Sequence, residues 1–136
     1  MNVNFRSAQE TDLPFIYSSW LKSYRRAPEC KGMNNETFFT RYKKIIQKIM
    51  KDSIFIVSCN QDDSDQIFGY MAYKYIEDIF VLHYIYIKYP YRKFGMSLKM
   101  LGSVTDLDKP FMVTFANDWT QGMKDKLLLT YDPFIR

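Results

Sequence analysis

The stretch that decides the fold is YIKYPYRKFGMSL, residues 86–98. Its first residues close an apolar strand, Pro90 ends that strand, and the spacing of apolar residues turns helical from Gly95 to about Leu107. A helix N-terminus leaves several backbone N–H groups unpaired and carries a partial positive charge. A glycine there lets a ligand approach the backbone, and Arg92 and Lys93 add charge, so the stretch has the composition of a phosphate cradle.

Two interpretations of this turn stay open on spacing alone. Short glycine-containing turns after strands are common. Arg92 and Lys93 can also be ordinary solvated side chains. The residues by themselves therefore fit a phosphate cradle and a plain turn equally well.

The strand that leads into the turn, residues 79–87, is apolar on both of its alternating faces. This pattern predicts a strand in the middle of a sheet that is covered on both sides. One face is expected to carry Phe80, Leu82, Tyr84 and Tyr86, and the other Val81, His83, Ile85 and Ile87.

The rest of the chain places strand and helix patterns around this unit. Alternating or β-branched runs predict strands at 2–7, 53–59, 67–76 and 111–115, and an extended piece at 128–134. Helical spacing predicts a helix from Thr11 or Asp12 to Tyr24, a second from Asn34 or Asn35 to Met50, and a short one at 118–126. The predicted order is β-α-α-β-β-β-α-β-α-β, which places the chain in the mixed α/β (α+β) class.

A single domain over 1–136 is expected, because 47% of the 136 residues are apolar and no linker divides the chain. Two cysteines and one histidine form neither a disulfide framework nor a metal-ligand set, so no metal is expected. The N-terminus lacks a signal-peptide pattern and no apolar run reaches membrane length, which predicts a cytoplasmic protein without membrane contact. The net charge of +4 fits a phosphate-bearing ligand, nucleic acid or a solvated basic face.

Residues 92–97, RKFGMS, resemble the Q/R-x-x-G-x-G/A pyrophosphate-binding motif of the GNAT superfamily of N-acetyltransferases. The apolar strand, proline and aromatic residue before Arg92 resemble the lead-in to that motif, and the order of elements is similar along nearly the whole chain. The resemblance implies a mixed, mainly antiparallel central sheet with helices on both faces. The small size and the Tyr/Lys/Ile-rich composition are similar to GNAT-like proteins of tailed phages, which would place the protein in a host cytoplasm.

The resemblance implies acetyl-CoA, or another acyl-CoA, as co-substrate. The pyrophosphate would lie on the amides of Phe94, Gly95, Met96 and Ser97, helped by Arg92 and Lys93. The pantetheine arm would pair with the exposed backbone of the preceding strand, at Ile85 and Ile87. Family members transfer the acyl group directly to an amine, and the acceptor of this chain is unidentified.

Three residues on or just before the motif strand are candidates for the base, namely His83, Asp78 and Glu77. His83 has an unperturbed pKa that suits the task, although a histidine on an apolar strand is more often a satisfied core residue. The position of the tyrosine that often serves as acid in the family falls near Lys124, so Tyr131 is the candidate acid.

A second function remains open, in which a GNAT-like fold has lost catalysis and binds a host protein, a virion component or nucleic acid. The absent tyrosine and an abbreviated closing hairpin favour it. If the chain is an enzyme, its mild basicity favours an acidic acceptor, or one carried on nucleic acid, over a cationic one. Trp20 and Tyr24, at helical spacing, are either core residues or part of an acceptor-binding surface.

Overall fold

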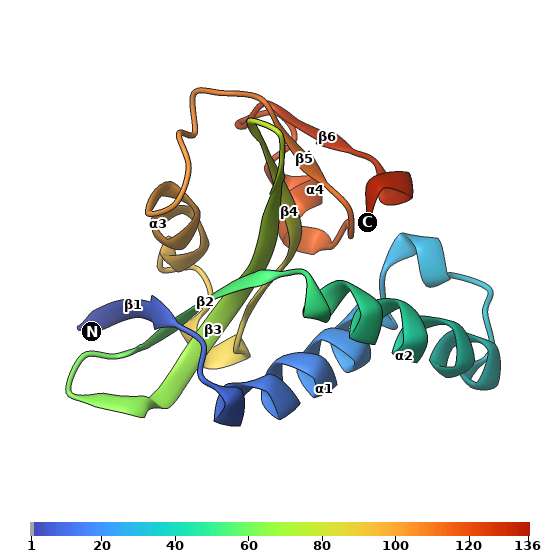
Figure 1. Cartoon of the computed structure of the whole chain (residues 1–136), viewed down its shortest axis with the longest axis horizontal. Helices are drawn as coiled ribbons and strands as arrows, with labels where there is room; N and C mark the ends of the chain where they lie inside the picture. Colours follow the sequence, from blue (N-terminus) through green and yellow to red (C-terminus); the bar gives the residue numbers. More distant parts are fainter. Residues whose placement is uncertain (1) are drawn as a thin grey trace.

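A six-stranded sheet in the order β1-β2-β3-β4-β5-β6 forms the centre of the computed structural model, which describes residues 2–136 (Figure 1). Strands β1 to β4 pair antiparallel, whereas β5 pairs parallel with β4 and β6 pairs parallel with β5. The sheet is therefore mixed and mainly antiparallel, as predicted. The strands are β1 (Val3–Ser7), β2 (Ile54–Asn60), β3 (Asp63–Ile76), β4 (Ile79–Ile87), β5 (Phe111–Val113) and β6 (Leu129–Tyr131).

Helices cover both faces of the sheet, which confirms the expected architecture (Figure 1). One apolar cluster joins α1 (Leu13–Tyr24) and α2 (Asn35–Lys51) to the first face. A second cluster joins α3 (Met96–Gly102) to the opposite face, with α4 (Asp118–Gly122) contributing Trp119. The order of helices and strands is the predicted one, with short 3-10 turns added between them. None of the described helices is long and apolar enough to cross a membrane.

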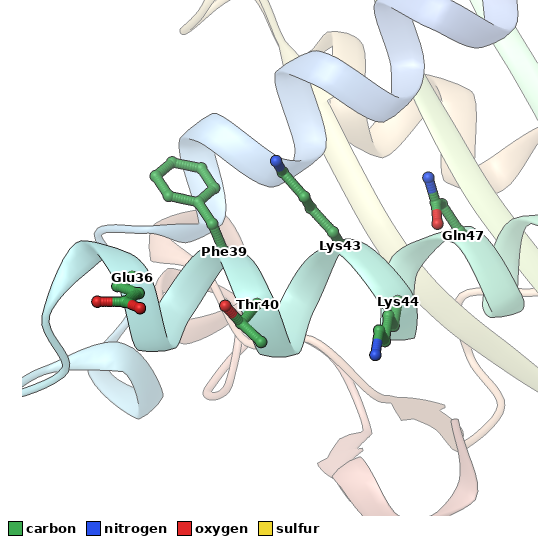
Figure 2. Close-up of a pocket in the computed structure, with 6 residues that line it drawn as sticks. All are labelled: Glu36, Phe39, Thr40, Lys43, Lys44 and Gln47. Carbon is green, nitrogen blue, oxygen red and sulfur yellow. The ribbon is translucent and has the colours of Figure 1, made fainter.

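Helix α2 follows its sequence pattern closely. The Asn34 side chain accepts a hydrogen bond from the Thr37 amide at 2.8 Å and so caps the first turn. Its inner face is buried, whereas its outer face carries lysines and lines a shallow depression of about 460 Å³. Figure 2 shows that every lining residue of this depression comes from α2. The depression is thus the flank of one helix and has no polar groups converging on it from other elements.

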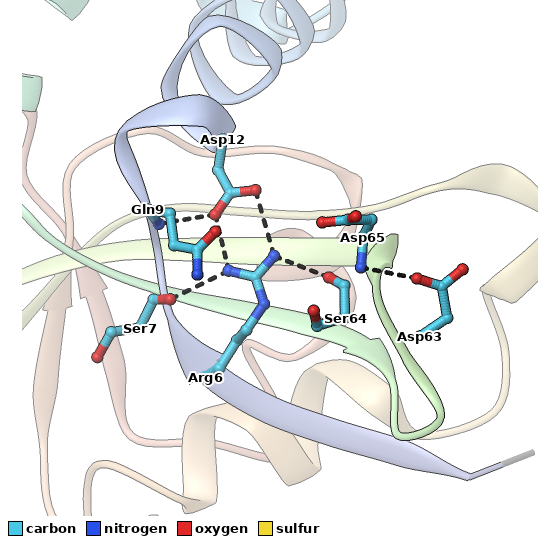
Figure 3. A network of polar contacts seen from close by, with 7 residues as sticks. All are labelled: Arg6, Ser7, Gln9, Asp12, Asp63, Ser64 and Asp65. Carbon is cyan, nitrogen blue, oxygen red and sulfur yellow. Dashed lines mark hydrogen bonds and ion pairs between the residues drawn. The ribbon is translucent and has the colours of Figure 1, made fainter.

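The first strand is tied to the rest of the fold by a partly buried ion pair (Figure 3). Arg6 Nη1 lies 2.7 Å from Asp12 Oδ2, and Arg6 Nη2 donates to the Ser64 carbonyl at 2.9 Å. The same carboxylate accepts from the Gln9 amide, and the Arg6 hydrogen bond lowers the pKa of Asp12. One arginine therefore holds together β1, the start of α1 and the start of β3.

The predicted alternation along β4 is wrong in its second half, because the strand contains a β-bulge at His83. In the ladder with β3, Tyr84 pairs with Ala72 while Leu82 pairs with Tyr73, which leaves His83 as the extra residue. A bulge shifts the side-chain phase by one residue. Phe80 and Leu82 therefore share the α3 face with Ile85 and Ile87, and Tyr84 packs on the α1–α2 face.

Several predicted boundaries also differ. β3 begins at Asp63 rather than at residue 67, because residues 61–62 alone make the turn after β2. α3 ends at Gly102 rather than near Leu107, and α4 ends at Gly122 rather than at Lys126. Both helices stop at a glycine, a residue with low helix propensity.

Candidate functional site

The turn between β4 and α3 has two residues with left-handed backbone. Pro90 begins a 3-10 turn, Tyr89–Tyr91, directly after the strand. Lys93 has φ 70° and Gly95, the N-cap of α3, has φ 72°. A Cβ built on Gly95 would meet no atom within 4 Å, so the backbone conformation, not crowding, requires glycine there.

The amides of this turn are unpaired. Within residues 2–136, the N–H groups of the cradle residues, Phe94, Gly95, Met96 and Ser97, donate no hydrogen bond, and the first bond into the helix runs from the Lys99 amide to the Gly95 carbonyl. Left-handed residues between such amides turn several N–H groups toward one side, which forms an anion-binding concavity. The cradle therefore has the donors that a phosphate requires.

Arg92 is fixed beside these amides. Its Nε donates to the Ile87 carbonyl at 2.7 Å, and its guanidinium lies 5.6 Å from the Tyr86 ring and 5.7 Å from the Tyr89 ring. Its two Nη nitrogens bond no described residue. Arg92 thus presents an oriented, exposed positive charge, and Lys93 is exposed next to it.

Beyond the bulge, β4 turns part of its backbone toward a gap in the sheet. The Lys88 amide donates to the Phe68 carbonyl of β3 at 2.8 Å. Because backbone groups alternate in direction along an antiparallel ladder, the N–H and C=O groups of Ile85 and Ile87 point away from β3. On that side β5 has already ended at Val113. The N–H groups of Ile85 and Ile87 consequently have no acceptor among residues 2–136.

The carbonyl groups on the same edge are occupied. Asn117 Nδ2 donates to the Ile85 carbonyl at 3.0 Å, and Arg92 Nε donates to the Ile87 carbonyl. Asn117 is also the N-cap of α4, since its Oδ1 accepts from the Thr120 amide at 3.0 Å. Where β4 and β5 no longer pair, β4 thus keeps two free N–H donors, and Asn117 ties the start of α4 to the strand.

The three base candidates do not lie together. His83 is buried at the bulge, 1% exposed, with its Nδ1 2.7 Å from the Thr114 hydroxyl at the end of β5. Burial and the charges of Lys74 and Arg136 lower the pKa of His83 to about 4, so the imidazole is neutral at pH 7. Glu77 and Asp78 are exposed in the turn before β4, about 30 Å of extended strand away from Ile87.

Tyr131, the candidate acid, lies in a different cluster. Its hydroxyl donates to Glu29 Oε2 at 2.6 Å, and the same carboxylate accepts from Tyr24 and, on Oε1, from Tyr42 at 2.6 Å. Burial alone would raise the pKa of Glu29, but the three hydroxyl donors and the charge of Arg136 lower it to about 2. Burial and the bond to Glu29 raise the pKa of Tyr131 to about 12.

Sequence reasoning missed four residues of these surroundings, Glu29, Thr114, Asn117 and Arg136. Asn117 carried a detectable signal, because it precedes a short helix with a threonine at the third helical position. Glu29 and Arg136 are 107 positions apart and meet only in the folded chain. Trp20 and Tyr24 are fully buried, so both belong to the core.

No protein-family model and no curated protein sequence matches the chain, but 68 chains of solved structures do. A possible acetyltransferase from Clostridium difficile 630 superposes with a TM-score of 0.60 at 14% identity, covering 97% of this chain and 95% of its own. PaiA N-acetyltransferase from Thermoplasma acidophilum, in complex with coenzyme A, superposes with a TM-score of 0.55 at 16% identity. The match covers 76% of this chain and 70% of that one. The chain has the GNAT fold.

Another match is a GNAT family acetyltransferase from Brucella melitensis in complex with acetyl-CoA, with a TM-score of 0.53, 12% identity, and coverage of 76% of this chain and 66% of that one. At these identities the likeness establishes the GNAT fold, which is the fold that the resemblance implied.

Proposed function

We propose that this chain is an acyl-CoA-dependent N-acyltransferase that moves an acyl group, acetyl by default, directly from coenzyme A to an amine. The observation that carries the proposal is the run of unpaired amides around Gly95, beside the free Nη groups of Arg92. Unpaired amides and an oriented guanidinium are the donors that bind phosphate groups most effectively. The coenzyme A and acetyl-CoA complexes among the similar structures support the same ligand class.

The β4 edge supports a place for the rest of the coenzyme. With the pyrophosphate on residues 94–97, the pantetheine arm would run back along β4, where the N–H groups of Ile85 and Ile87 lack acceptors. Amide groups of the arm would pair with these donors as an added strand does. The thioester would then lie near the bulge at His83, where β4 and β5 separate.

The reaction needs an attacking neutral amine, whose nitrogen forms a bond to the thioester carbonyl carbon while the carbon–sulfur bond breaks. The nitrogen loses a proton and the departing thiolate gains one. Holding the two reactants in line supplies much of the rate enhancement. His83 is the base candidate that lies at the separation of β4 and β5, and a proton would reach it through the Thr114 hydroxyl. Its pKa of about 4 corrects the expectation of an unperturbed imidazole and makes His83 a weaker base than a solvent-exposed histidine. Tyr131 stays protonated at neutral pH, as an acid requires, but its hydroxyl bonds Glu29.

Arg92→Ala should weaken acetyl-CoA binding about tenfold, because one charge-assisted contact to phosphate is lost. Isothermal titration with acetyl-CoA and with free CoA would measure the change, and both ligands should lose affinity equally. Arg41→Ala, on the exposed outer face of α2, is the matched control and should bind as the unaltered protein does. Equal affinity for Arg92→Ala and Arg41→Ala would contradict the proposed cradle.

His83→Asn should lower kcat at least tenfold while the Kd for acetyl-CoA stays within twofold. Asparagine can keep the hydrogen bond to Thr114 but cannot take up a proton, so the change separates the base role from the packing role. Steady-state kinetics with a primary amine, combined with coenzyme titration, would test this. Unchanged turnover would remove His83 from the mechanism.

A catalytically inactive binding protein is the second candidate, and the burial of His83 and the bond from Tyr131 to Glu29 favour it. The basic outer face of α2 suits an anionic partner such as nucleic acid (Figure 2). In that case acetyl-CoA would bind without turnover for any amine tested. Salt-dependent binding of duplex DNA, lost when α2 lysines are replaced, would support this second function.

A further inference from the structure

Glu29 stands at the centre of a cage that binds a positive charge. The residue lies in a 3-10 turn, Pro28–Cys30, between α1 and α2, and its side chain is 30% exposed. Three tyrosine hydroxyls donate to its two oxygens. A carboxylate that accepts three neutral donors keeps its full negative charge, because none of them neutralises it. The cage therefore has an anion that only a cation can balance.

The cation in the structure is the side chain of Arg136. Its Nη2 lies 2.9 Å from Glu29 Oε1, and its Nη1 donates to the Thr114 carbonyl at 3.2 Å. The guanidinium lies 4.2 Å from the centroid of the Phe115 ring and 5.6 Å from that of Tyr42. One carboxylate, one carbonyl and two aromatic faces together form the environment that proteins use for guanidinium and ammonium groups.

The segment that carries Arg136 is a single short turn at the surface. In Figure 1 the 3-10 turn Pro133–Ile135 lies beside the loop between α1 and α2. Phe134 is 94% exposed, Pro133 and Ile135 are half-buried, and Lys74 Nζ donates to the Ile135 carbonyl at 3.1 Å. A guanidinium or ammonium group that replaces Arg136 would cover the same faces of Phe115 and Tyr42, so the exchange would leave little apolar area exposed.

The cage adjoins the proposed reaction site. Thr114 contributes its carbonyl to Arg136 and its hydroxyl to His83 at the β4 bulge. Phe115 stacks edge-on with Trp20 and Tyr24 beneath the same surface. A molecule whose cationic group fills the cage is thus held one residue away from the point where β4 and β5 separate.

We propose that the cage formed by Glu29, Tyr42, Thr114 and Phe115 is the acceptor site for a molecule that carries a guanidinium or ammonium group, and that Arg136 occupies it until such a molecule displaces it. Calling the ligand an acceptor rests on the proposed acyl-transfer function, whereas the cation site itself does not. The proposal reverses the expectation from net charge, which favoured an acidic acceptor. Local geometry outweighs a net charge of +4 because the cage carbonyl, carboxylate and rings act at contact distance.

The test is isothermal titration with agmatine, which carries a guanidinium at one end and a primary amine at the other. Arg136→Ala should bind agmatine at least tenfold more tightly than the unaltered protein, because the competing side chain is gone. Arg136→Gln, which keeps more of the packing, should show the same direction if the alanine variant is poorly folded. N-butylurea, of similar length and uncharged, should not bind to either variant.

The role of the Glu29 carboxylate is tested in the double variant Arg136→Ala with Glu29→Gln. This variant should lose the affinity for agmatine that Arg136→Ala gains. Agmatine affinity that is the same with and without Arg136, or that is unaffected by Glu29→Gln, would overturn the proposal. Acetyl-CoA is titrated separately into each variant. Coenzyme binding without agmatine binding would overturn the cation site and leave the proposed function standing, whereas agmatine binding without coenzyme binding would support the site and contradict the proposed function.

Discussion

Gly95→Val should reduce the affinity for acetyl-CoA about a hundredfold, equivalent to about 2.7 kcal/mol. Valine at φ 72° is strained, so the turn would rearrange and its amides would no longer point to one side. The new side chain would also project into the open space beside Gly95, where no protein atom lies within 4 Å and where the phosphates are proposed to bind. Calorimetric titration of the variant with acetyl-CoA measures the effect.

The chain offers a closely matched control in Gly32. This residue has φ 88° and also has no atom within 4 Å of a built Cβ, but it lies between α1 and α2. Gly32→Val should therefore lose a similar amount of stability in thermal unfolding and keep its affinity for acetyl-CoA. If the two variants lose the same affinity, the effect of Gly95→Val comes from general destabilisation and the cradle is not the binding site.

The order of elements was predictable because local signals were strong. Pro90 and Gly95 mark the turn, Asn34 caps α2, and the apolar residues of α2 repeat at helical spacing. The bulge at His83 was not predictable, because an extra residue in a ladder depends on the neighbouring strand and leaves no mark in an apolar run. The same bulge decides which β4 side chains share a face and where β4 and β5 separate.

The candidate site likewise has one part that the sequence predicts and one part that it does not. The cradle is local in sequence, so its glycine and basic residues could be read directly from residues 92–97. The Glu29 cage could not be predicted from the sequence, because its charged partners lie 107 positions apart and no local pattern joins its tyrosines to Glu29. Tyr131 was selected as an acid, yet its hydroxyl contacts Glu29 in this structure. Long-range polar contacts of this kind follow from the finished fold and not from any local pattern.

Glu29→Gln should lower the free energy of unfolding by about 2 kcal/mol at pH 7. Hydrogen bonds to a charged acceptor contribute more than bonds to a neutral one, and the amide would place a donor against the tyrosine hydroxyls and Arg136. The effect is limited to this size because the carboxylate is partly exposed and solvent weakens its interactions. Urea unfolding followed by circular dichroism would measure the difference. Tyr131→Phe should lower the free energy of unfolding by about half as much as Glu29→Gln.

The pH dependence gives this prediction a sharper form. The folded pKa of Glu29, about 2, lies below its ordinary value of 4.5, so the carboxylate stabilises the fold fully above about pH 4.5 and loses this effect as the pH falls toward 2. The difference in the free energy of unfolding between the unaltered protein and Glu29→Gln should thus be constant from pH 7 to 5 and shrink toward zero near pH 2.

The Asp12 contribution to the pH dependence has the same sign but is common to both proteins and cancels. Glu36→Gln, on the exposed first turn of α2, should show little difference at any pH. A difference between the unaltered protein and Glu29→Gln that persists undiminished at low pH would mean that shape, not charge, makes Glu29 important, and the cation cage would lose its physical basis.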